Sequence, residues 1–148
     1  SDMTADAPKA HLTAAIWNWD VYYGTAIEAA QTCGEAKNFV ATMGSSAYYG
    51  GLAEEFVDVS PLSENCAEGT AEAIEAVRKL IVDGQWDVFS GVKLSFSGAA
   101  GSVAVAQSDA ALVANDGTEI VAAGGASVDD GVIQGSMNYY VAGVTQVN

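Results

Sequence analysis

The sequence predicts an α/β fold in a single domain over residues 4–148, with a β-rich insertion at 92–115. The chain has 148 residues, which suits one ordinary domain, and half of them are hydrophobic, which argues against disorder. Segments with strand character alternate with segments of helical periodicity over residues 10–91. Residues 92–123 are rich in Gly, Ala, Ser and Val, with apolar residues at alternate positions. Residues 1–3 resemble a cloning remnant that is not part of the fold.

The first half is predicted to begin with a strand that runs into a helix. Residues 10–17 have strand character and lead into a polar, aromatic turn. Asp20 is expected to cap a helix over about 21–32, and Gly34 is a natural stop for it. Two weaker strand candidates follow, the second of them at residues 56–59.

The clearest helix of the chain is predicted at about 70–83. Thr70 is expected to cap it, and Gly84 stands where a C-terminal glycine belongs. One apolar stripe runs along this helix, made of Ala73, Ile74, Val77, Leu80 and Ile81.

The remaining elements are shorter. Residues 86–89 have the composition of a strand, and β-hairpins are expected in the 92–115 insertion and beyond it. The Asn-Asp-Gly sequence at 115–117 is a strong turn signal. A last short helix is expected at about 127–136, although two glycines weaken it.

The charge of the chain excludes several classes of partner. Five basic and 19 acidic residues give a net charge of −14. Binding to nucleic acid needs clusters of Lys and Arg, which five basic residues cannot build. The same negative charge disfavours docking on an anionic membrane surface. No apolar run approaches the ~18–20 residues needed to span a membrane.

The two cysteines, Cys33 and Cys66, lie in polar, loop-like contexts. Neither has a second Cys or a His close by in the sequence, so the spacing of a zinc site is absent. A structural disulfide between them is the favoured interpretation, and a redox or nucleophilic pair is the alternative. A disulfide would place the protein in an oxidising compartment.

No set of residues in the sequence points to catalysis. There is no serine nucleophile elbow, no metal-binding His pair and no phosphate-binding glycine loop. The single histidine, His11, is expected to be structural or exposed. The adjacent acidic pairs at 54–55 and 129–130 are expected to be solvated, because neighbouring side chains diverge on helices and strands. The sequence therefore predicts no enzyme, no metal and no cofactor.

The aromatic segment at residues 17–23 is the candidate binding site. Four aromatic residues lie in seven positions, between the end of a predicted strand and the start of a predicted helix. Trp and Tyr rings there could stack on a planar ligand, with polar neighbours supplying hydrogen bonds. The alternative is that the rings fill the seam between helix and sheet. The candidate ligand-binding residues are Trp17, Asn18, Trp19, Asp20 and Tyr22.

A second aromatic cluster is formed by Tyr48 and Tyr49, which are followed by Gly50 and Gly51. Glycines after aromatic residues suggest a tight bend or a close backbone approach. Core packing is the favoured interpretation of this cluster.

Four segments, in order, resemble the basic membrane lipoprotein (Bmp/Med) family. The segment at 17–23 is similar to the family's Trp-Asp/Asn-Trp-Gly-Pro-Tyr-Tyr element, and the end of the chain at 138–144 is similar to its aromatic-Val-Glu-Gly-Val ending. Residues 48–51 followed by 57–63, and then residues 81–91, are similar to family stretches that come in the same order. Each piece is weak alone, but together they are fairly specific.

The resemblance implies part of a type I periplasmic-binding fold, with a mainly parallel sheet flanked by helices. Family members are substrate-binding proteins of ABC importers, and two lobes close around a purine nucleoside or base. In this chain, Trp17 or Trp19 would stack on the nucleobase and Asn18 would be a polar contact. The resemblance also implies an ABC permease as partner and a location outside the cytoplasm, in the periplasm or lipid-anchored at the outer face of the cell membrane.

The chain departs from the family in three ways. Asp20-Val21 stands where the family has Gly-Pro, and the insertion at 92–115 has no counterpart there. Family members are about twice as long, so the chain resembles only their C-terminal portion, and the N-terminal lobe is expected to be missing. The alternative function is a shortened relative that acts as a structural or protein-interaction module, with the insertion as a partner or self-association surface.

Overall fold

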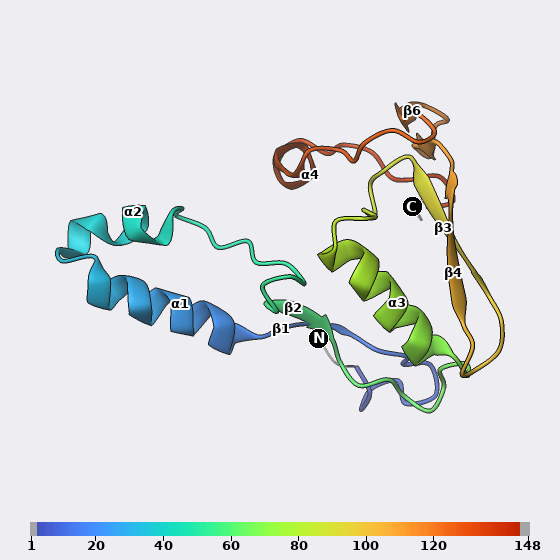
Figure 1. The fold of residues 1–148 in the computed structure, drawn as a ribbon, viewed down its shortest axis with the longest axis horizontal. Coiled ribbons are helices and arrows are strands. Elements are labelled where there is room, and N and C mark those ends of the chain that lie inside the picture. Colours follow the sequence, from blue (N-terminus) through green and yellow to red (C-terminus); the bar gives the residue numbers. More distant parts are fainter. Residues whose placement is uncertain (1–2, 146–148) are drawn as a thin grey trace. The chain divides into compact units, whose positions relative to one another are not determined.

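The computed structural model describes residues 3–145 of the chain (Figure 1). The chain divides into two compact units, residues 1–67 and residues 68–148. Two of the three residues interpreted as a cloning remnant, 1–2, lie outside the described part. No helix within residues 3–145 has the length and apolar character that crossing a membrane would require.

The first unit combines a short two-stranded antiparallel sheet with two helices. Strand β1 (Ala15–Trp17) pairs antiparallel with β2 (Val57–Val59), so that Trp17 lies opposite Val57. Helix α1 (Trp19–Thr32) begins directly after β1. A 3₁₀ turn (Ala36–Asn38) and the short helix α2 (Phe39–Met43) follow, and α2 folds back alongside α1 (Figure 1).

Hydrogen bonds between distant segments hold β1 and β2 together. The buried Ser60 hydroxyl accepts a bond from the Ala14 N–H at 3.0 Å, and the Thr13 hydroxyl donates to the Ser60 carbonyl at 2.7 Å. At the other end of the pair, the Asn18 N–H donates to the Phe56 carbonyl at 2.8 Å. The start of α1 is thus fixed to the start of β2.

The second unit contains a helix, two antiparallel strand pairs and a short final helix. Helix α3 (Thr70–Val82) is followed by β3 (Val92–Ser97) and β4 (Ala104–Asp109), which pair over six residues. Strands β5 (Leu112–Val113) and β6 (Glu119–Val121) form the other pair, with an irregular register. Helix α4 (Asp130–Gly135) follows, and the Asp129 carboxylate caps it by accepting from the Gly131 N–H at 2.8 Å.

The predicted mainly parallel sheet is wrong. The described residues contain three two-stranded antiparallel sheets and no parallel sheet. A parallel pair needs a crossover of a dozen or more residues, whereas β3 is joined to β4, and β5 to β6, by short turns. The turn predicted at 115–117 does connect β5 to β6.

The strand predicted at 86–89 is also absent, because side-chain hydrogen bonds fold this segment into turns. The Trp86 indole N–H donates to the Val92 carbonyl at 2.8 Å, and the Asp87 carboxylate accepts from the Phe89 N–H at 2.8 Å. Two predicted N-cap residues are also wrong. Asn18, not Asp20, stands at the N-cap position of α1, and Gly69, not Thr70, stands at the N-cap position of α3.

Few side chains are deeply buried in either unit. Among the described residues, the buried hydrophobic side chains are Ala29, Phe56 and Ala114. The total accessible surface is 10152 Å². Phe56 is the one large side chain among the three, and it lies beneath the candidate site.

Candidate ligand-binding site

A cluster of aromatic rings gathers where β1 runs into α1, and we refer to it as the ring cluster. Its members come from β1, from the first turn of α1, from the segment after α2 and from the residue before β2. Neighbouring ring centres lie between 5.0 and 6.3 Å apart. The ring cluster consists of Trp17, Trp19, Tyr22, Tyr23, Tyr48 and Phe56.

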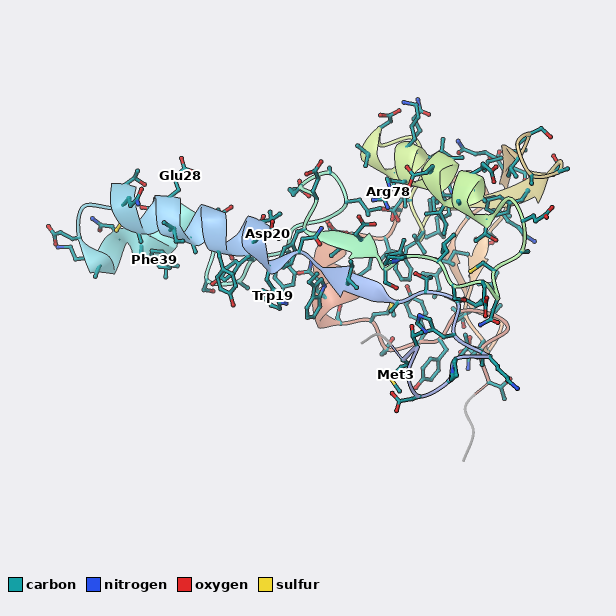
Figure 2. All side chains as sticks on the ribbon, turned by 90° about the horizontal axis from the view of Figure 1, so that it is seen from below. Met3, Trp19, Asp20, Glu28, Phe39 and Arg78 are labelled. Atoms are coloured by element: carbon teal, nitrogen blue, oxygen red, sulfur yellow. The ribbon has the colours of Figure 1, made fainter. Side chains whose placement is uncertain are left out.

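Trp19 is the centre of the ring cluster. Its ring lies 5.4 Å from that of Trp17 and 5.8 Å from that of Phe56, and both pairs are nearly perpendicular. Such edge-to-face pairs are favourable because the positive ring edge meets the negative face of its neighbour. Figure 2 shows Trp19 and Asp20 together at the start of α1. The helix start therefore presents an indole that is held on two sides.

Phe56 and Tyr48 form the more buried side of the ring cluster. The Phe56 ring is buried and meets the Tyr48 ring edge-on at 5.0 Å, and Tyr48 in turn lies 5.6 Å from Tyr22. Gly50 allows this packing, since a Cβ there would lie 2.6 Å from the Phe56 Cβ. Of the tight bend or close backbone approach that the two glycines suggest, the structure shows a close approach of Gly50 to the Phe56 and Tyr48 side chains.

Other rings of the cluster remain open to solvent. Trp17 is 61% exposed, Trp19 48% and Tyr23 58%. Large aromatic side chains that are this exposed and adjacent form an apolar patch, which is a feature of binding surfaces. The alternative prediction, that both indoles are buried in a seam, does not describe this surface.

The two polar candidates lie at the same helix start but differ in their bonding. The Asn18 side-chain amide donates to the Glu55 carbonyl at 2.7 Å, while its amide oxygen accepts no hydrogen bond within residues 3–145. Asp20 is exposed in the first turn of α1, where a carboxylate interacts favourably with the helix dipole. In the described part of the chain Asp20 has no ion-pair partner.

All five predicted ligand-binding residues are thus brought together at one helix start. Three members of the ring cluster are not among these five. Tyr23 lies within the aromatic segment at 17–23, whereas Tyr48 and Phe56 come from elsewhere in the chain. The sequence places Tyr48 in a separate cluster and Phe56 in a strand. The pairing of β1 with β2 brings them to the indoles, and only the two glycines after Tyr48-Tyr49 pointed to a close approach.

The cysteines lie apart from the ring cluster as free thiols. The Cys33 thiol donates to the Ala30 carbonyl at the end of α1, whereas the Cys66 thiol donates to the Leu12 carbonyl before β1, each at 3.5 Å. The 14 residues of α1 span about 21 Å, far more than the reach of a disulfide. The predicted disulfide is therefore not formed in this arrangement.

Residues that could bind a metal do not gather at the site. Within residues 3–145, no group of three or more His, Cys, Asp or Glu side chains is arranged to hold a metal ion. The ring cluster offers aromatic faces, and beside it lie the exposed Asp20 carboxylate and the amide oxygen of the half-buried Asn18, which suit a planar ligand with N–H or O–H donors.

No protein-family model matches the chain, and no curated protein is significantly similar to it.

Proposed function

We propose that the ring cluster binds a purine nucleoside or base by aromatic stacking. The observation that carries this proposal is the exposure of Trp17 and Trp19 beside each other, with Trp19 held in place by Phe56. Stacking of a nucleobase on an aromatic side chain is worth about 1–3 kcal/mol. A ring that is already fixed by its neighbours loses little conformational entropy when the ligand stacks on it.

The polar groups at the helix start complement this ligand class. The Asn18 amide oxygen and the Asp20 carboxylate can each accept a hydrogen bond from a base N–H or a ribose hydroxyl. The net charge of −14 favours neutral nucleosides and bases over phosphorylated nucleotides. No bond of the ligand is made or broken in this proposal.

We further propose that the chain serves as the substrate-binding component of an ABC importer outside the cytoplasm. This part rests on the resemblance of the four sequence segments to the basic membrane lipoprotein family. A permease would then receive the ligand, and a second lobe would close over the exposed faces of Trp17 and Trp19.

A second candidate function is supported by the openness of the aromatic patch. Exposed, adjacent indoles on an open surface also suit the burial of a protein partner, since Trp and Tyr are enriched in interface hot spots. In that case Asn18 acts only as a bracing residue, through its bond to the Glu55 carbonyl.

Calorimetric titration of the chain with adenosine, guanosine and adenine tests the ligand class. We expect heat with at least one of them, and at least tenfold weaker binding by the Trp17→Ala variant. The Tyr49→Ala variant is the matched control, because Tyr49 is 71% exposed nearby but makes no ring contact within residues 3–145. Absence of heat with all three ligands would overturn the purine proposal and favour the protein-interaction module.

A further inference from the structure

The outer edge of β3 is unpaired in the second unit. Within the described residues, β3 pairs with β4 alone. In an antiparallel pair, successive residues direct their backbone groups alternately toward the partner strand and away from it. At the start of β3, the Gly91 carbonyl accepts from the Ala110 N–H, whereas the Val92 carbonyl turns outward to the Trp86 indole.

This alternation fixes which backbone groups face outward. Lys93, Ser95 and Ser97 are bonded to β4, and Leu94 and Phe96 direct their N–H and C=O groups away from it. Within residues 3–145, no hydrogen bond reaches these groups of Leu94 and Phe96. The edge thus offers two donors and two acceptors in a regular row.

The free edge adjoins an open apolar groove. The side chains of Val92, Leu94 and Phe96 share one face of β3, and together with Val77 and Val88 they line a cavity of about 430 Å³. Phe96 is 54% exposed and Val88 59%. A strand added at this edge would cover apolar surface as well as satisfy the backbone groups.

We propose that two copies of this chain associate by pairing their β3 strands antiparallel across a two-fold axis at Ser95. In this register, Leu94 lies opposite Phe96 of the second copy, and the two residues exchange both backbone hydrogen bonds. The same pair occurs twice because of the symmetry, so four hydrogen bonds form and the two β3–β4 pairs become one four-stranded sheet.

The sequence of β3 is self-complementary in this register. Apolar Leu94 meets apolar Phe96 on one face, and on the other face Lys93 lies opposite Ser97, so that no like charges are opposed. Residues 92–97 contain no acidic residue, although the chain as a whole is strongly acidic. The bond from Trp86 to the Val92 carbonyl limits the pairing to the stretch that begins at Leu94.

The β4 edge is less suited to the same role. Its outward groups belong to Val105 and Gln107, so a second strand there would place a polar side chain against the apolar face.

A cysteine scan of the sheet tests both the association and its register. At the two-fold axis, Ser95 and its copy form a non-hydrogen-bonded pair with Cβ atoms about 4.5–5.5 Å apart, close enough for a disulfide after small adjustment. In a Cys33→Ser, Cys66→Ser background, we expect Ser95→Cys to give a covalent dimer under mild oxidation at least tenfold faster than Ser108→Cys. Ser108 lies on β4 and shares the face of Ser95, so it is the matched control.

Light scattering on the unmodified chain measures the mass in solution, independently of the cross-linking. We expect a mass twice the 15.1 kDa of the monomer, falling toward it on dilution. The Phe96→Lys variant should be monomeric with an unchanged circular dichroism spectrum, whereas Phe96→Leu should still associate. A monomer at every concentration, or equal cross-linking rates at positions 95 and 108, would overturn the proposal. Nucleoside binding by the ring cluster is unaffected by either outcome.

Discussion

At the scale of single residues, the closest packing in the first unit surrounds Gly50. Its missing side chain leaves room for Phe56, on whose ring both Trp19 and Tyr48 rest. Gly91 has the same role in the second unit, where a Cβ would lie 2.0 Å from the Ala122 carbonyl oxygen. In each unit, two chain segments thus meet closely at a glycine.

Replacing Gly50 by Ala should destabilise the first unit by about 1–3 kcal/mol, because the new methyl group overlaps Phe56 and the Tyr48 ring. The free energy of unfolding in urea measures the effect. Gly24→Ala is the control, since its Cβ meets nothing within 4 Å and α1 gains a better helix former. Equal stability of the two variants would contradict the packing described here.

Asp116 provides a prediction about pH in the β5–β6 turn. Hydrogen bonds from the backbone N–H and the hydroxyl of Thr118 hold the pKa of the Asp116 carboxyl below its usual value of 3.8. A lowered pKa in the folded state means that the stabilisation is present at neutral pH and is lost as the pH falls through the folded pKa.

We therefore expect wild type to be slightly more stable than Asp116→Asn at pH 7, and the two to converge in acid below pH 3.8. An NMR titration of the Asp116 carboxyl carbon, with unfolding measured at both pH values, provides the check. If wild type and Asp116→Asn differed in stability by the same amount at pH 7 and in acid, the hydrogen bonds from Thr118 to the Asp116 carboxylate would not have the proposed effect.

At the scale of elements, the start of α1 is held by hydrogen bonds to the segment before β2, and not by a side-chain N-cap bond within the helix. Asn18 stands at the N-cap position but makes no side-chain cap bond, and its amide instead donates to the Glu55 carbonyl before β2. Its own N–H bonds to the Phe56 carbonyl. The orientation of the indoles therefore depends on contact between segments 37 residues apart.

The Asn18→Ala variant should lose about 0.5–1.5 kcal/mol of unfolding free energy, because the Glu55 carbonyl loses its donor. Urea unfolding and amide hydrogen exchange in the first turn of α1 measure this. Gln31→Ala, at an exposed position of the same helix, should change the stability much less. If the folded Asn18→Ala variant also bound nucleoside more weakly than wild type, this would indicate a direct contact between Asn18 and the ligand.

Local patterns predicted α1, α3 and α4 better than the strand pairing, whereas α2 was not predicted. The apolar stripe from Ala73 to Ile81 and the flanking glycine mark α3 within one residue at its C-terminal end. The pairing of β1 with β2 joins residues more than 40 apart, and no local pattern carries that information. The segment at 86–89 has a strand-like composition, but the Trp86 indole and the Asp87 carboxylate form bonds that a strand would not allow.

The candidate site was only partly predictable, because some of its residues are neighbours in the sequence and others come from distant segments. Trp17, Trp19 and Tyr22 are close in the sequence, and the predicted passage from strand into helix brings their rings together. Phe56 and Tyr48 join them only through the antiparallel sheet and the close approach at Gly50. The resemblance that suggested the ligand also suggested a parallel sheet, and residues 3–145 contain none.

At the scale of the whole molecule, exposed apolar surface is the main feature to explain. Few side chains are buried among the described residues, and many large hydrophobic side chains are exposed. Two separate surfaces account for part of it, the ring cluster in the first unit and the outer edge of β3 in the second. The net charge of −14 opposes non-specific association, because charged copies repel one another at long range.

The most direct test of the proposed function is an NMR titration of the indole N–H signals with adenosine. The chain has three tryptophans, of which Trp17 and Trp19 belong to the ring cluster. Trp86, in the second unit, serves as an internal reference because its indole N–H is bonded to the Val92 carbonyl. We predict that the Trp17 and Trp19 signals shift together in a saturable manner while that of Trp86 stays in place. Three unmoved signals, or a shift of Trp86 alone, would contradict ligand binding at the ring cluster.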